Sequence, residues 1–163
     1  MGIGSELDAI LTGVVAGLVG TLVMDALNIV AAQTQLISRI DVAMIGRMAA
    51  GWARGRFWYS SPSEMQQVHN EALIGIITHY TVGVVFSVPF VVGWSLLVGG
   101  SPTPAWALLY GIATTVASWF FVYPSTGMGA FGRLSPESRK ATLSSVANHL
   151  FYGVGLAIGI ALV

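Results

Sequence analysis

Long apolar stretches alternate with shorter polar stretches along this chain of 163 residues. Four of the apolar stretches, at about residues 7–31, 70–97, 104–123 and 141–163, contain few charged residues. A helix of about 20 predominantly apolar residues crosses the hydrocarbon core of a bilayer. The pattern therefore predicts an all-α, polytopic membrane protein, in which residues 1–163 form a single domain, a four-transmembrane-helix bundle.

The connection between the first two spans has a periodic pattern of its own. Its apolar residues recur at spacings of three and four, with arginines between or just after them: Ile37, Ile40, Met44, Ile45, Met48 and Trp52. This pattern is typical of an amphipathic helix lying in the membrane interface, and a helix that caps the bundle fits it equally well. We predict a helix over residues 37–52, within an interfacial segment of about residues 37–56.

A helix start is predicted shortly before the second span. Ser61-Pro-Ser-Glu64 has the spacing of a capping box, with proline at the first helical position. The interpretation is that a helix begins at Pro62, outside the membrane, and continues into the span.

Composition strengthens the membrane assignment and excludes several classes of function. The chain is 55% hydrophobic and 9% charged, whereas soluble domains are about 25% charged. Its mean hydropathy is +0.76 and its net charge is zero, so no electrostatic feature favours nucleic acid as a partner. The lack of cysteine excludes disulfides, zinc–thiolate sites and iron–sulfur clusters. The predicted partner is the lipid bilayer.

The basic residues predict the orientation of the chain in that bilayer. All seven Lys and Arg residues fall in the first and third connections, between residues 39 and 56 and between residues 133 and 140. Short cytoplasmic connections carry an excess of Lys and Arg. We therefore expect these two connections in the cytoplasm and both termini outside.

Two short motifs occur twice. Gly17-x-x-x-Thr21 in the first span matches Gly111-x-x-x-Thr115 in the third. His79-x-x-x-Gly83 in the second span matches His149-x-x-x-Gly153 in the fourth. The matches predict two pseudo-repeated helical hairpins in the same orientation, related by an axis along the membrane normal. Chance is the alternative, because Gly and Thr are common in membrane helices.

Three ionisable residues are predicted to lie at one depth. At a rise of 1.5 Å per residue, Asp25, His79 and His149 lie roughly 9 to 12 Å from the cytoplasmic side of their spans. Tyr123 reaches the same layer, and Asn148 belongs to a polar stripe on the fourth span. Glu71 is roughly 12 Å from His79 along the helix, which favours an acid on the access side over a further ligand. Polar side chains at membrane depth usually face a partner or a cavity.

Two cofactor hypotheses follow from this layer. Asp25, His79 and His149 have the donor types of a facial triad for iron, or of three protein ligands to zinc. Alternatively, His79 and His149 could ligate haem b from two facing helices, with Gly83 and Gly153 making room for the ring. Asp25 is the objection to haem, because the chemistry of haem does not require a carboxylate beside it.

Other hypotheses need no cofactor. Asp25 could pair with a histidine to conduct protons or bind a small solute, as intramembrane ionisable residues do in transporters. Four helices enclose a narrow path, so most solutes would require a homo-oligomer. The same polar residues could instead only fix helix register, and the chain could be an accessory subunit of a larger membrane complex. The sequence identifies no reaction and no substrate.

Five ordered motifs resemble a known group of proteins. These motifs are Thr21-Leu-Val-Met-Asp25, Asp41-Val-Ala-Met-Ile-Gly-Arg47, His79-Tyr-x-x-Gly-Val-x-Phe86, Tyr123-Pro-x-x-Gly-Met-Gly-Ala-Phe-Gly132 and Asn148-His-Leu-x-Tyr-Gly-Val-Gly-Leu156. Together they resemble small four-span prokaryotic membrane proteins classed as domains of unknown function. The resemblance implies a four-helix fold in the cytoplasmic (inner) membrane. It marks Asp25, His79, Gly129 and His149 as family-like positions, and it implies no activity.

Overall fold

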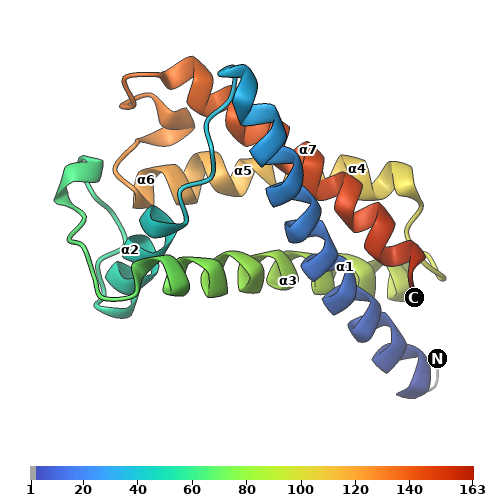
Figure 1. Ribbon diagram of the computed structural model, residues 1–163. Coiled ribbons are helices and arrows are strands. Elements are labelled where there is room, and N and C mark those ends of the chain that lie inside the picture. Colours follow the sequence, from blue (N-terminus) through green and yellow to red (C-terminus); the bar gives the residue numbers. More distant parts are fainter. Residues whose placement is uncertain (1–2) are drawn as a thin grey trace. The chain divides into compact units, whose positions relative to one another are not determined.

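The computed structural model describes residues 3–163, and all regular structure in this range is helical (Figure 1). The three long helices are α1 (Ile3–Ala31), α3 (Glu71–Leu97) and α7 (Ser138–Ala161). The third span is a series of shorter pieces: α4 (Pro104–Ala113), α5 (Thr115–Ala117), a π-helical turn (Ser118–Val122) and α6 (Tyr123–Ser125). Four stretches of the described chain are long and apolar enough to cross a membrane: Ser5–Thr34, Glu71–Leu97, Pro104–Ser125 and Ser138–Ala161. The predicted all-α, four-span architecture is confirmed.

The helix of the first connection is shorter than predicted. It is α2 (Val42–Ala53), and the preceding residue, Asp41, accepts a hydrogen bond of 2.9 Å from the Met44 amide. An aspartate cap of this kind satisfies an amide that has no partner within the helix. Residues 37–41 therefore stay outside the helix although their apolar spacing continues the pattern.

The predicted helix start at Pro62 is wrong. Pro62–Glu64 forms one 3₁₀ turn, and α3 begins only at Glu71. The Glu64 carboxylate does not complete a capping box, because it accepts a hydrogen bond of 2.6 Å from the Arg56 guanidinium. Asn70, immediately before α3, has a left-handed backbone with φ of 57°. This residue separates the connection from the span.

The chain divides into two compact units, which we describe separately. The apolar unit consists of Met1–Leu27, Tyr80–Thr114 and Asn148–Val163. The basic unit consists of Asn28–His79 and Thr115–Ala147. The apolar unit contains three acidic side chains and no Lys or Arg, a net charge of −3. The basic unit contains seven basic and four acidic side chains, a net charge of +3.

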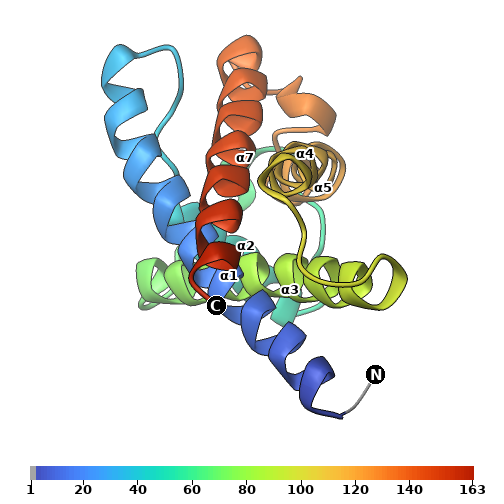
Figure 2. The ribbon, with the colours of Figure 1, turned by 90° about the vertical axis from the view of Figure 1, so that its right-hand side faces the viewer.

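Helices in the apolar unit approach closely at glycines. A Cβ atom on Gly17 of α1 would lie 2.7 Å from the Cα atom of Val84 on α3. A Cβ atom on Gly111 of α4 would lie 2.5 Å from the Cα atom of Gly153 on α7, and Figure 2 shows these two helices side by side. Small residues let membrane helices pack backbone to backbone. Both hairpins use the matched glycines for the same purpose, as the repeat predicts.

Contacts between α1 and α7 join the two hairpins of the apolar unit. A Cβ atom on Gly155 would lie 2.6 Å from the Cα atom of Gly20, and one on Gly159 would lie 2.6 Å from the Cα atom of Ala16. Leu156, on the same helix face as Gly159, is fully buried. The apolar unit is thus a cluster of helices held together at their backbones.

The basic unit is held by different contacts. α2 crosses the start of α3 where Gly46 meets Gly75, each backbone amide 3.0 Å from the Cβ position of the other glycine. Aromatic rings add a second layer, because Trp52 and Trp58 both pack against Phe121 at centroid distances of 5.2 and 5.6 Å. These contacts fix the connection against the start of α3 and the π-helical turn.

Candidate functional site

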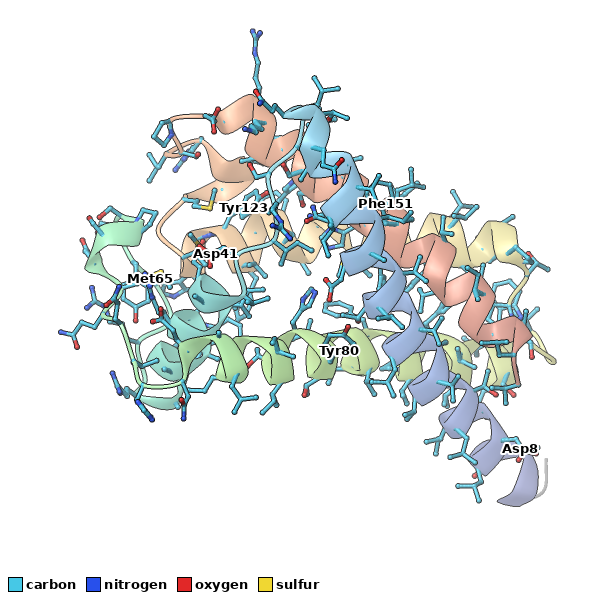
Figure 3. The ribbon with its side chains drawn as sticks, in the orientation of Figure 1. Asp8, Asp41, Met65, Tyr80, Tyr123 and Phe151 are labelled. Atoms are coloured by element: carbon cyan, nitrogen blue, oxygen red, sulfur yellow. The ribbon has the colours of Figure 1, made fainter. Side chains whose placement is uncertain are left out.

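Asp25 on α1 and Tyr80 on α3 form the centre of a polar site in the apolar unit. The two helices run antiparallel, since the Cβ position of Gly13 meets Val88 and that of Gly17 meets Val84. Continuing this register places Tyr80, which Figure 3 labels on α3, level with Thr21, one turn before Asp25 on α1. The Tyr80 phenol lies close enough to the Asp25 carboxylate for the two groups to interact electrostatically.

Thr21 and Tyr152 support this site from the adjoining turns. The fully buried Thr21 hydroxyl donates to the Gly17 carbonyl at 2.9 Å, one turn before Asp25. Tyr152 of α7 donates to the Gly83 carbonyl at 2.5 Å, one turn after Tyr80. Both hydroxyls are therefore used within the protein, and the Tyr152 hydrogen bond ties α7 to α3.

Asn148 lies on the α7 face that meets α1. Tyr152 and Gly155 contact Gly20 of α1, and Asn148 precedes Tyr152 by one helical turn. The structure thus places this predicted residue at the same end of the apolar unit as Asp25. Asn148 is half-buried, as Asp25 and Tyr80 are.

Asp25 shares its unit with no Lys or Arg side chain. The other acidic residues of the apolar unit are Glu6 and Asp8, and His149 is its sole residue, other than the chain terminus, that could carry a positive charge. A carboxylate in a low-dielectric region is costly unless it is paired, protonated or bound to a cation. The neutral Tyr80 phenol can donate to the carboxylate, but it cannot neutralise it.

His149 occupies a different face of α7 from Asn148. Its carbonyl oxygen lies 2.7 Å from the Cβ position of Gly111, and Gly153, one turn later, contacts α4 at Ala107 and Leu108. His149 therefore belongs to the α4-facing stripe of its helix. His79 belongs to the basic unit.

The predicted metal triad finds no support. Among residues 3–163, no three His, Asp or Glu side chains form a group that could hold a metal ion. Helical spacing had placed Asp25, His79 and His149 at one depth, but depth does not determine the direction in which a side chain leaves its helix. Asp25 meets α3, whereas the His149 turn meets α4.

The residues expected to make room for haem do not fit that role. Beside Gly83, the space for a Cβ atom is filled by Thr21 and by the Gly17 carbonyl. Beside Gly153, a Cβ atom would lie 3.0 Å from the Cα atom of Leu108. The space beside each glycine is taken by another helix, so neither glycine leaves room for a porphyrin ring.

Glu71 is an ion-pair partner, and the prediction of an acid on the access side is not supported. Its carboxylate accepts hydrogen bonds of 2.8 and 2.7 Å from Nε and Nη2 of Arg47, and a third of 3.2 Å from the Val68 amide. These contacts close the N-terminus of α3 and tie it to α2. The hydrogen bond to Glu71 raises the pKa of Arg47 above its ordinary value.

Tyr123 is engaged within the basic unit. Its hydroxyl donates to the Ala141 carbonyl at 2.5 Å. Its ring lies against Gly132, whose φ of 70° requires the left-handed region. Tyr123 thus joins α6 to the start of α7.

A family model covers most of the chain, from residue 14 to residue 163. Its description is "Protein of unknown function (DUF2938)". The chain belongs to the DUF2938 family. No curated protein and no solved structure matches it. The family membership confirms the resemblance to proteins of unknown function, and it supplies no activity. The matched range includes Asp25, Tyr80 and Asn148.

The matched range also includes four buried polar atoms with no hydrogen-bond partner among the described residues. They are Nε1 of Trp52, Oγ1 of Thr115, Nε1 of Trp119 and Oγ of Ser125, and all four lie in the basic unit. Buried polar groups in native proteins are nearly always satisfied, so each position could hydrogen-bond to water or a ligand. The indole N–H groups can only donate, whereas the hydroxyls can donate or accept. The adjacent π-helical turn is a feature often found at functional sites.

Sequence reasoning missed Tyr80 and singled out its neighbour His79. The signal that could have identified Tyr80 is its place one turn before Gly83, the glycine that packs against Gly17 and Thr21 of α1. A residue in that register must lie beside the α1 turn that runs from Thr21 to Asp25. His79 also lies one turn before Gly83, so this signal applies to both neighbours.

Proposed function

We propose that this protein handles protons or a small cationic solute within the membrane, without a metal or haem, and that Asp25 is the group that binds the proton or cation. The observation that supports this proposal is an acidic side chain in an apolar span, beside a phenol and in a unit without Lys or Arg. An ionised aspartate near the centre of a membrane helix costs about 2.5 to 3.5 kcal/mol on insertion scales. Uptake of a proton or a cation removes most of that cost.

The neighbouring residues have supporting roles in this proposal. Tyr80 donates to Asp25 when the carboxylate is ionised and orients it toward α3. Asn148, on the α1-facing side of α7, offers an amide that can serve as donor or acceptor. A solute larger than a proton would need a wider path than four helices enclose, so transport of such a solute would require a homodimer.

We further infer the orientation of the chain in a cytoplasmic membrane. The seven Lys and Arg residues in the two longer connections favour the cytoplasmic side for those connections, with both termini outside. In this orientation, Asp25 lies roughly 9 Å from the cytoplasmic end of α1. Protons or cations would then reach it from the cytoplasm by the shorter route.

Proton flux through reconstituted protein tests the proposal. The full chain is placed in liposomes that contain a pH-sensitive dye, and a potassium diffusion potential drives proton entry. We expect the wild type to acidify the lumen faster than protein-free liposomes. Asp25→Asn should remove this excess rate, because an amide cannot take up the proton, and Tyr80→Phe should reduce it.

Asp8→Asn is the matched control, because it removes an exposed carboxylate from the same helix and the same unit. It should leave the rate unchanged. A wild-type rate equal to that of protein-free liposomes, with sodium and potassium flux also absent, would contradict the proposal and favour an accessory role in a larger complex. An undiminished rate in Asp25→Asn would contradict the role of Asp25.

A further inference from the structure

A polar hollow lies in the basic unit, outside the Asp25 site. It has a volume of about 210 Å³ and is formed by α2 and by the connection between α2 and α3. Its lining contains three arginines together with four other residues: Arg47, Arg54, Arg56, Gly51, Tyr59, Glu64 and Gln66. Pockets for whole drug-sized ligands measure about 300 to 1,000 Å³, so this hollow suits a smaller group.

The end of α2 shapes one wall of the hollow. The Gly51 carbonyl accepts hydrogen bonds of 2.9 Å from the amides of both Arg54 and Arg56, which reverses the chain just after the helix. Gly55 permits this reversal through its left-handed φ of 76°. The Tyr59 hydroxyl occupies the space where Gly51 would otherwise carry a side chain. The wall is therefore built from closely packed backbone.

The 3₁₀ turn shapes the opposite wall. The Arg56 guanidinium lies 4.2 Å from the centroid of the Tyr59 ring and pairs with Glu64 at 2.6 Å. The Ser60 amide also donates to Glu64, at 3.5 Å. These contacts hold Arg56 and Glu64 in place whether or not the hollow is filled.

The charges of the hollow do not balance. Arg47 is paired with Glu71 and Arg56 with Glu64. Arg54 is exposed, and its guanidinium makes no ion pair with an acidic side chain in the described part of the chain. The hollow therefore keeps one uncompensated positive charge, with N–H donors in the fork geometry that matches a phosphate.

Aromatic side chains place the hollow at the depth of lipid headgroups. Phe57 and Trp58 follow Arg56 directly and are 47% and 54% exposed. Exposed Trp beside a basic segment is typical of the interface between hydrocarbon and water. Binding of a soluble anion does not require exposed aromatic side chains beside the site. A lipid headgroup, in contrast, presents its phosphate at the depth where such side chains lie.

We propose that this hollow binds the phosphate of an anionic phospholipid headgroup, with Arg54 as the residue that contacts it. Arg47 and Arg56 contribute positive potential while they remain paired with their carboxylates. Tyr59 and Gln66 offer further hydrogen-bond donors from the lining. This inference does not depend on the proposed role of Asp25.

Native mass spectrometry of the full-length protein in detergent can test the assignment. Phosphatidylglycerol and phosphatidylcholine of the same acyl chains are added in turn, and the bound fraction is compared. We expect the wild type to prefer phosphatidylglycerol. Arg54→Gln should lower its affinity for phosphatidylglycerol about fivefold, since one arginine near a membrane surface contributes about 1 kcal/mol. Arg54→Lys should recover part of the loss.

Arg133→Gln is the matched control, because it removes an exposed arginine of the same unit that does not line the hollow. It should leave the preference for phosphatidylglycerol intact. Equal losses in Arg54→Gln and Arg133→Gln would reduce the effect to net charge and overturn the site. No preference between the two lipids would also overturn it. Binding of added inorganic phosphate by the wild type alone, without that preference, would assign the hollow to a free anion instead.

Discussion

The apolar unit and the basic unit are stabilised by different kinds of contact. In the apolar unit, glycines bring helix backbones together, and buried hydroxyls of residues such as Ser87 and Tyr152 donate to main-chain carbonyls. In the basic unit, ion pairs and tilted or edge-to-face aromatic pairs hold a connection of irregular backbone. The difference follows from the solvent of each region, because irregular backbone needs water or side-chain partners whereas lipid-facing helices satisfy their own. An ionisable side chain is routine in the basic unit and exceptional in the apolar unit.

The largest expected effects come from enlarging the contact glycines of each unit. Gly111→Ala places a methyl group 2.5 Å from the Cα atom of Gly153, and Gly75→Ala places one 2.7 Å from the Val42 carbonyl carbon. Backbone cannot move aside as a side chain can, so each variant should lose about 3 kcal/mol of stability. Thermal unfolding in detergent, followed by size-exclusion chromatography, measures the loss.

Gly93→Ala is the control for both variants. Gly93 also lies in a long helix, and nothing lies within 4 Å of its Cβ position. Alanine there should be neutral or stabilising by up to about 1 kcal/mol, because it favours the helix. A Gly111→Ala protein as stable as Gly93→Ala would mean that the backbone contact between α4 and α7 is not present in the membrane protein.

A smaller effect is expected from the ion pair that is confined to the basic unit. Arg47→Gln removes both hydrogen bonds to Glu71 and should lower Tm by less than the glycine variants do. Arg56→Gln should lower Tm less again, because Arg56 and Glu64 are 51% and 38% exposed, against 26% and 21% for Arg47 and Glu71. Water and salt weaken an exposed pair.

Thermal unfolding at low and high salt compares the two ion pairs. Equal losses of Tm in Arg47→Gln and Arg56→Gln, with equal sensitivity to salt, would contradict this prediction. Solvent exposure would then not determine how much each ion pair contributes to stability.

The smallest effect is expected from a hydroxyl of the apolar unit. Tyr152→Phe removes the hydrogen bond to the Gly83 carbonyl and keeps the ring that packs against Gly20. Hydrogen bonds between membrane helices contribute about 0.6 kcal/mol on average. Chemical unfolding in mixed micelles should show a loss of this size. A loss above about 2 kcal/mol would mean that polar bonds, more than glycine contacts, hold the apolar unit together.

The four spans could be predicted from the sequence because hydropathy over about 20 residues reports directly on the thickness of the bilayer. The repeated glycines could also be predicted, since Gly17 and Gly111 lie in small-residue patterns whose purpose is close packing. Both signals are local in the sequence. Neither depends on how a helix is rotated about its axis.

The candidate site depends on that rotation, which spacing along a helix does not report. Spacing fixes the depth of His149, whereas the structure places the His149 carbonyl against Gly111 of α4. The predicted start of α2 was wrong for a related reason. The apolar spacing continues through Ile37 and Ile40, whereas the cap at Asp41 decides where helical hydrogen bonds begin.

Infrared difference spectroscopy of the Asp25 carboxyl in reconstituted protein tests the proposed site most directly. Between two pH values that span its titration, a protonated carboxyl in an apolar environment contributes a carbonyl stretching band. The account predicts one such band in the wild type, absent in Asp25→Asn, shifted in frequency in Tyr80→Phe and unchanged in Asp8→Asn. A wild-type spectrum in which Asp25→Asn changes nothing, or purified protein that holds stoichiometric metal lost in His79→Ala, would contradict it.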